Sequence, residues 1–240
     1  MASDLHVVLF PFSAFGHMLA YFHLSKALAK AGVHVSFVST PRNIKRLPTV
    51  PPSLAPLINL VKLPWPTLDV KYGLPEGAEA TSDLPTEKIP YLKIGYDLLK
   101  QPFKQFIAEK SPNWIISDFC SHWVSDIAKE YGVQVMYFSI LSGTLGAFMG
   151  PPEYLVGGIQ NRPRRSPESL TSPPEWITFP SSVALRSYEA RETFNVMIKE
   201  HPSGIRDAER FAKTISGCRA IAVRGCGGHT FSTAQMDSKL

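Results

Sequence analysis

The sequence of 240 residues has little of several features that would define a class of protein at once. It has three cysteines, Cys120, Cys218 and Cys226, too few and too unevenly spaced for a disulfide framework. No His or Cys pairs stand at zinc-ligand spacing, so no metal site is expected. The apolar run Val7–Phe12 is too short for a signal-peptide core or a membrane span. We therefore expect a cytoplasmic protein without a membrane span.

Motifs that bind phosphate through glycine-rich loops are also absent. The loop after the first apolar run contains one glycine, Gly16, where a dinucleotide site needs G-x-G-x-x-G. No P-loop or G-x-S-x-G motif of hydrolases occurs. The net charge of +5 is spread along the chain, apart from Arg162, Arg164 and Arg165. Because a nucleic-acid surface needs denser basic clustering, we expect no nucleic-acid partner.

The chain instead alternates apolar runs with helical patterns. Leu5–Pro11 is rich in β-branched residues and predicts a buried strand of a parallel sheet. Met18–Ala31 has apolar residues near helical spacing, and Gly32 favours the end of a helix there. Val33–Thr40 alternates like a second strand. This opening predicts a βαβ unit with a right-handed crossover.

The alternation continues along most of the chain. Further strands are predicted at Leu57–Leu63, Trp114–Ser117, Val133–Phe138 and Arg219–Val223. Helices are predicted at residues 87–108 (interrupted at Pro90 and Pro102), Ser121–Tyr131, Leu141–Met149 and Ile205–Ile215, with a loop at residues 150–174. This pattern indicates a doubly wound, Rossmann-like α/β fold. We assign residues 1–224 to one domain and predict that the small, polar residues 225–240 are disordered.

Candidate site residues follow the strands, because ligands of open parallel sheets bind beyond the carboxyl ends. His17 stands at a helix N-terminus, whose partial positive charge disfavours an imidazolium and suits a general base. Asp118 follows Trp114–Ser117 and could hydrogen-bond the far nitrogen of His17, fixing its tautomer. Alternatively, His17 is a capping or packed residue and Asp118 caps the next helix.

The same loops supply candidate walls for a binding pocket. The candidates are Phe12, Phe15, Gly16 and Phe119, which we predict contact a bound small molecule. Trp123 is a further candidate, although a place in the core is equally compatible with its sequence context.

These residues also carry a resemblance to a known family. Phe12–Tyr21, followed by L-S-K-A-L, resembles the opening of plant family-1 UDP-glycosyltransferases, as does V-S-F-V-S-T-P-R-N-I at residues 35–44. Five further stretches are similar to family 91, whose members extend the sugar chains of flavonoid, steroid and terpenoid glycosides and include rhamnosyltransferase-like enzymes. They are Glu76–Asp83, Lys88–Asp97, Tyr96–Phe106, Trp114–Phe119 and Pro173–Pro180.

The resemblance implies the acceptor-binding N-terminal domain of a GT-B fold. It implies that His17 deprotonates a hydroxyl of a small glycoside or aglycone, that Asp118 orients His17, and that the hydroxyl attacks a UDP-sugar with inversion. UDP-sugar is then a co-substrate, and no cofactor or metal is implied. Ile140 stands where many glucosyl-transferring relatives have a hydroxyl residue that touches the sugar, so it would tolerate a deoxy sugar. Ala20 replaces the usual proline.

The resemblance stops near Arg224, before the motif with which relatives hold the UDP-sugar. We therefore expect the donor domain to be absent and the chain to be inactive alone, because catalysis requires a positioned donor. The alternative is a non-catalytic domain that binds an acceptor or a partner. The sequence indicates no oligomeric state.

Overall fold

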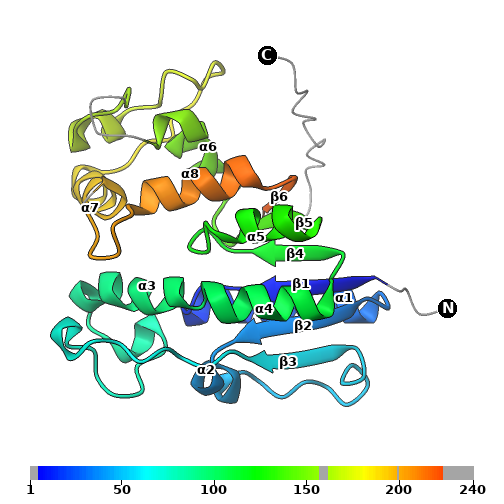
Figure 1. Cartoon of the computed structure of the whole chain (residues 1–240). Coiled ribbons are helices and arrows are strands. Elements are labelled where there is room, and N and C mark those ends of the chain that lie inside the picture. The colour runs from blue at the N-terminus through cyan, green and yellow to red at the C-terminus, as the bar shows by residue number, and fades with distance from the viewer. Residues whose placement is uncertain (1–4, 157–161, 199, 224–240) are drawn as a thin grey trace.

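The computed structural model describes residues 5–156, 162–198 and 200–223, which build one parallel six-stranded sheet in the order β3-β2-β1-β4-β5-β6. Figure 1 shows the strands side by side, with their carboxyl ends at the left. The strands are β1 (His6–Phe10), β2 (His34–Ser39), β3 (Ile58–Lys62), β4 (Trp114–Ser117), β5 (Gln134–Ser139) and β6 (Ala220–Val223). This confirms the predicted doubly wound α/β fold, and the predicted tail lies outside the described residues.

Eight α-helices and several short 3-10 helices connect the strands within the described residues. The α-helices are α1 (Phe15–Lys30), α2 (Pro41–Arg46), α3 (Ile89–Leu98), α4 (Lys100–Lys110), α5 (Val124–Tyr131), α6 (Gly143–Met149), α7 (Ser187–Ile198) and α8 (Asp207–Gly217). The 3-10 helices are η1 (Val70–Tyr72), η2 (Thr81–Asp83), η3 (Thr86–Lys88), η4 (Pro152–Tyr154) and η6 (Pro167–Thr171). None of the helices in the described ranges is long and apolar enough to cross a membrane.

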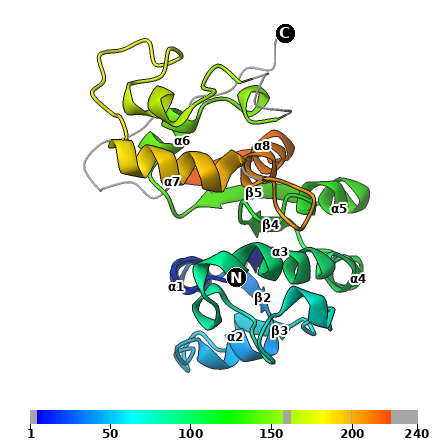
Figure 2. The same cartoon turned by 90° about the vertical axis from the view of Figure 1, so that its left-hand side faces the viewer.

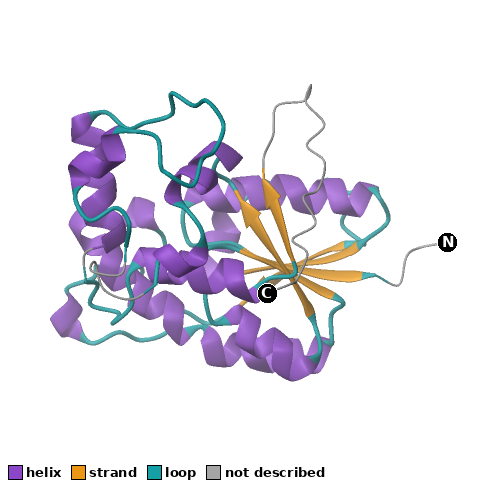
Figure 3. Cartoon of the chain, turned by 90° about the horizontal axis from the view of Figure 1, so that it is seen from above, coloured by secondary structure: helices purple, strands orange, loops and turns teal. Residues whose placement is uncertain are grey.

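Alternate strand residues point to the two faces of the sheet and build a core on each. Val8 and Phe10 of β1 pack with α3, α4 and α5, whereas Val7 and Leu9 pack with α1 and α2. Figure 3 shows helices on both sides of the central strands. Burial on both faces explains why β1 reads as a continuous apolar run rather than an alternating one.

The upper region, which we define as residues 141–217, lies above the sheet in Figure 1 and contains α6, α7 and α8. Figure 2 shows α6, α7 and α8 together, on the side away from β2 and β3. We call residues 5–139 and 219–223 the sheet region. Helix α8 joins the two, because it packs on α5 and β5 and also on α7 and η4.

Three details differ from the sequence prediction. Residues 87–108 form two helices that meet at Leu99. Pro90 does not interrupt α3, because it lies in the first turn, where no backbone N–H is needed for a helical hydrogen bond. No helix was predicted after Val33–Thr40, but Pro41 begins α2, because proline is also compatible with the first helical position. Helix α7 was not predicted, although Ala190, Phe194 and Met197 follow helical spacing.

Candidate active site

The structure brings His17 and Asp118 together at the carboxyl edge of the sheet. β1 and β4 are adjacent and parallel, with Phe10 opposite Ser117. The loops that leave these strands therefore start side by side, one leading to His17 in the first turn of α1 and the other to Asp118. His17 Nδ1 lies 2.7 Å from Asp118 Oδ2. The predicted contact between the two side chains is confirmed.

Asp118 is held by the backbone of both loops. The backbone N–H of Phe12 donates to Oδ2 at 3.1 Å, and that of Phe119 donates to Oδ1 at 2.7 Å. Asp118 is 2% exposed. Helix α5 begins only at Val124, with Trp123 at the capping position, so the alternative that Asp118 caps this helix is wrong.

The hydrogen bond to Asp118 defines the tautomer of His17. A carboxylate oxygen accepts, so Nδ1 is the ring nitrogen that donates to Asp118, and Nε2 is the one left for another group. The His17 side chain is 18% exposed and lies edge-on to Phe12, with Phe119 on another side. Nε2, the ring nitrogen away from Asp118, has no hydrogen-bond partner among the described residues.

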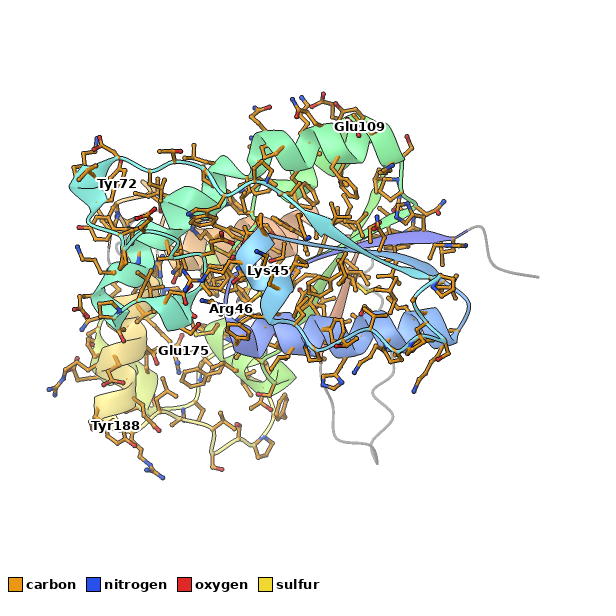
Figure 4. All side chains as sticks on the ribbon, turned by 90° about the horizontal axis from the view of Figure 1, so that it is seen from below. Lys45, Arg46, Tyr72, Glu109, Glu175 and Tyr188 are labelled. Carbon is orange, nitrogen blue, oxygen red and sulfur yellow. The ribbon has the colours of Figure 1, made fainter. Side chains whose placement is uncertain are left out.

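The other predicted site residues lie at different distances from this pair. Phe12 and Phe119 contact each other and His17, as ring centroids 5.7 to 5.9 Å apart show. Gly16, next to His17 in the chain, is exposed. No atom lies within 4 Å of the position that a side chain at Gly16 would occupy, so there is open space here. Phe15 packs in the cluster under α1 and α2, with the Arg46 guanidinium 5.7 Å from its ring (Arg46 is labelled in Figure 4).

Trp123 and Ile140 are placed by their packing. Trp123 is 3% exposed among Phe10 and Phe103, and its Nε1 donates to Asp97 at 3.3 Å, so it is a core residue as the alternative interpretation had it. Ile140 directly follows β5, at the same edge of the sheet as Asp118, and is partly buried. No described contact joins Ile140 to His17.

Two buried tyrosines fix the edge of the sheet on which the site stands. The Tyr21 hydroxyl of α1 donates to the carbonyls of Ser117 and Phe138, at 2.7 and 2.9 Å. The Tyr96 hydroxyl of α3 donates to the carbonyl of Pro11 at 3.1 Å. Burial raises the pKa of both hydroxyls well above the ordinary value, so they act only as neutral donors.

Helix α8 holds the loop that carries Asp118, which sequence reasoning did not predict. Thr214 donates to the carbonyl of Phe119 at 3.1 Å, and Arg210 Nη1 donates to the carbonyl of Cys120 at 2.9 Å. Arg210 is fully buried. Burial alone would lower the pKa of this guanidinium, but its hydrogen bonds to Asp97 outweigh that effect and raise it.

A second buried pair joins α8 to α3. Lys93 donates to both carboxylate oxygens of Asp207, at 2.6 Å to Oδ1, and both residues are nearly inaccessible to solvent. Asp97, one turn after Lys93 on α3, receives Arg210 at 2.7 Å. Two ion pairs therefore hold α8 against α3, and the basic residue comes from α3 in one pair and from α8 in the other. Through α8 they also hold the loop that carries Asp118.

The fold is that of the N-terminal domain of GT-B glycosyltransferases. The chain is similar to the structure of Phytolacca americana UGT2 complexed with UDP-2fluoro-glucose and pterostilbene, with a TM-score of 0.58 and 14% identity, over 92% of this chain and 48% of that one. No protein-family model matches the chain.

Curated proteins specify the family. The chain is 43% identical to UDP-glycosyltransferase 91A1 of Arabidopsis thaliana over 93% of its own length and 46% of that protein. It is 34% identical to soyasaponin III rhamnosyltransferase of Glycine max, over 92% of its own length and 44% of that protein. The chain is thus a member of the plant UDP-glycosyltransferases related to family 91, and it spans about half the length of the curated relatives that it matches.

Proposed function

We propose that this domain binds a small hydroxylated acceptor and supplies the general base for sugar transfer from a UDP-sugar. The observation that carries the proposal is the 2.7 Å contact of His17 Nδ1 with Asp118, which leaves Nε2 free beside Phe12 and Phe119. A flavonoid or terpenoid glycoside fits an apolar frame around a base, and the names of the matched relatives include a rhamnosyltransferase acting on a saponin.

The proposed reaction has the following steps. Nε2 of His17 takes the proton of the acceptor hydroxyl, and the oxygen attacks the anomeric carbon from the face opposite the nucleotide. The bond from that carbon to the phosphate oxygen breaks, UDP leaves with the electron pair, and the configuration inverts. Asp118 stabilises the imidazolium that forms, because its carboxylate already accepts the Nδ1 proton.

Transfer needs a positioned UDP-sugar as well as a base. Orientation of reactants supplies about 7–11 kcal/mol of barrier reduction, which a base alone does not provide. The matched relatives are about twice as long as this chain. We therefore propose that these 240 residues turn over only when a donor-binding domain is joined to them, and that alone they form a non-catalytic, acceptor-binding domain.

The proposal includes a contact of Ile140 with the donor sugar. Its place after β5, at the edge that carries Asp118, supports this role. An apolar side chain loses nothing when a sugar hydroxyl is missing, so a deoxy sugar such as rhamnose is accepted at least as well as glucose. In the joined protein, Ile140→Ser should shift the ratio of kcat/KM values toward UDP-glucose. A ratio that does not change would refute the contact.

The test joins this chain to the C-terminal half of a family 91 relative and measures UDP release with a panel of UDP-sugars and glycosides. His17→Ala should lower kcat by about 10²–10⁴-fold, the usual contribution of a general base. Asp118→Asn should lower it as well, because an amide can present its N–H to Nδ1 and favour the wrong tautomer. Retained activity in His17→Ala would disprove the assigned base.

The chain alone gives a readout that needs no turnover. Nitrogen-15 NMR of the His17 ring should show the proton on Nδ1, and Asp118→Asn should move it toward Nε2. UDP release by the unjoined, folded chain would overturn the proposal that it is non-catalytic alone.

A further inference from the structure

The upper region contains a cavity of about 40 Å³, partly open to solvent, between α6, α7 and the segments that contain η4 and η6. On the scale of about 10–15 Å³ for one water, it has room for about three or four waters. Its wall is mostly apolar and aromatic, with Phe148, Trp176 and Phe194 among its members, but it also includes Arg162 and Arg164. It shares no lining residue with the cluster around His17.

The two arginines have donors that the protein does not use. Arg162 is 4% exposed; its Nη2 donates to the carbonyl of Leu155 at 2.9 Å, but its buried Nε has no acceptor among the described residues. Arg164 donates through Nη2 to the carbonyl of Ser172, and its buried Nη1 likewise lacks a described acceptor. Buried donors of this kind are rarely left unpaired, so they point to a ligand.

The positive charge at the cavity is also uncompensated. Across residues 5–156, 162–198 and 200–223, no carboxylate forms an ion pair with Arg162 or Arg164. The nearest acids are engaged elsewhere or exposed: Glu209 pairs with Arg206 at 3.2 Å, and Glu175 (labelled in Figure 4) acts on Arg164 only at longer range. Burial lowers the pKa of both guanidinium groups, which marks the free-energy cost of two unpaired charges.

Aromatic rings complete the site. The Arg164 guanidinium lies 4.4 Å from the ring centroid of Phe148 and 5.3 Å from that of Trp176. Stacking of this kind orients the plane of a guanidinium, so that its edge faces a ligand. Apart from the two arginines, Tyr154 and Thr193 are the polar lining residues with hydroxyl groups, and most of the remaining wall is apolar or aromatic.

We propose that this cavity binds the carboxylate of a small apolar or aromatic acid, which Arg162 and Arg164 recognise. A carboxylate fits the available volume and accepts two parallel N–H bonds from a guanidinium. The cavity of about 40 Å³ has room for the carboxylate group itself, so the apolar body of the acid extends out of it along the aromatic lining residues. This binding is independent of sugar transfer and would survive if the proposed function failed.

The test is a titration of the full 240-residue chain, labelled with nitrogen-15 in arginine, with benzoate as the probe. The Nε–H signal of Arg162 should shift saturably with benzoate and not with benzamide, which has the same shape without the charge. Inorganic phosphate should bind at least about tenfold more weakly than benzoate.

Variants separate recognition from general charge. Arg164→Gln should weaken benzoate binding by about tenfold, the cost of one charge-assisted contact. Arg191→Gln removes the same charge from an exposed residue of α7 outside the cavity and should leave the dissociation constant within twofold. Arg162→Gln should abolish binding, with circular dichroism to verify its fold; Arg164→Gln carries the test if that variant does not fold.

Three results would overturn the proposal: benzamide shifting the Arg162 signal as benzoate does, Arg164→Gln binding benzoate as tightly as Arg191→Gln does, or phosphate binding as tightly as benzoate. The first would show an apolar pocket, the second a non-specific charge effect, and the third a site for small inorganic anions.

Discussion

The sheet region and the upper region are stabilised in different ways. In the sheet region, fully buried strand residues such as Val8, Leu9 and Phe37 pack against helices on both faces. In the described part of the upper region, two small apolar clusters contain three buried side chains each, and α7 has one, Ala190. Because the upper region has little apolar core, polar contacts are needed to hold it in one position on the sheet region.

The polar contacts in question are the two ion pairs between α3 and α8. Lys93 and Asp97 lie one turn apart on α3, and Asp207 and Arg210 lie about one turn apart on α8. The order of charge is reversed on the two helices, so a shift of α8 by one turn would bring like charges together. The pairs therefore specify one position for α8, and through it one position for the loop that carries Asp118.

The largest expected effect comes from breaking this junction. Arg210→Met should lower the free energy of unfolding by about 3–5 kcal/mol, because it leaves the Asp97 carboxylate and the Cys120 carbonyl without their buried partner. Urea denaturation measures the loss. Hydrogen exchange should show that the upper region loses protection first, since the sheet region keeps its core.

Two further variants test this account. Arg206→Met removes a more exposed arginine, whose partners Glu200 and Glu209 are 85% and 22% exposed, and should cost under about 1 kcal/mol. The double variant Arg210→Met with Asp97→Leu should recover part of the loss, because no charge is then left unpaired. An Arg210→Met variant as stable as Arg206→Met would show that α8 does not depend on this pair.

A smaller effect is expected from acid. Burial and then the charge of Arg210 lower the pKa of His122 from 6.5 to about 4. The unfolded chain binds a proton at His122 more readily than the folded chain does, so stability should fall as pH decreases from about 6.5 to 4. Burial also lowers the pKa of His6 in the sheet region. The second cause there is the charge of His34 rather than that of a buried arginine.

Matched variants separate these histidines. His122→Gln should flatten the loss of stability between pH 6.5 and 4 more than His6→Gln does, as thermal melts across that range would show. An equal flattening by both variants would mean that the junction at Arg210 does not repel a charged His122.

The sequence predicts the sheet region better than it predicts the upper region. Strands such as Leu5–Pro11, and the meeting of His17 with Asp118, follow from apolar runs and from the rule that loops at the carboxyl edge converge. Helix α7 was missed because little of it is buried, so its apolar pattern is weak. The pair of Lys93 and Asp207 could not be predicted, because local pattern says nothing of contacts 114 residues apart.

The smallest effect should come from a change at the N-terminal cap of α6, where the chain passes from the sheet region into the upper region. Ser142 caps α6, its side-chain oxygen accepting the backbone N–H of Leu145 at 3.3 Å. Ser142→Ala should cost about 1 kcal/mol by leaving that donor to water, whereas Ser142→Asp should keep the cap. Because α6 contributes Phe148 and Met149 to the arginine-lined cavity, the loss should appear as weaker benzoate binding with the sheet region unchanged. Faster hydrogen exchange in β1 or β4 of this variant would mean that the two regions unfold as one unit, and the contrast drawn between them would fail.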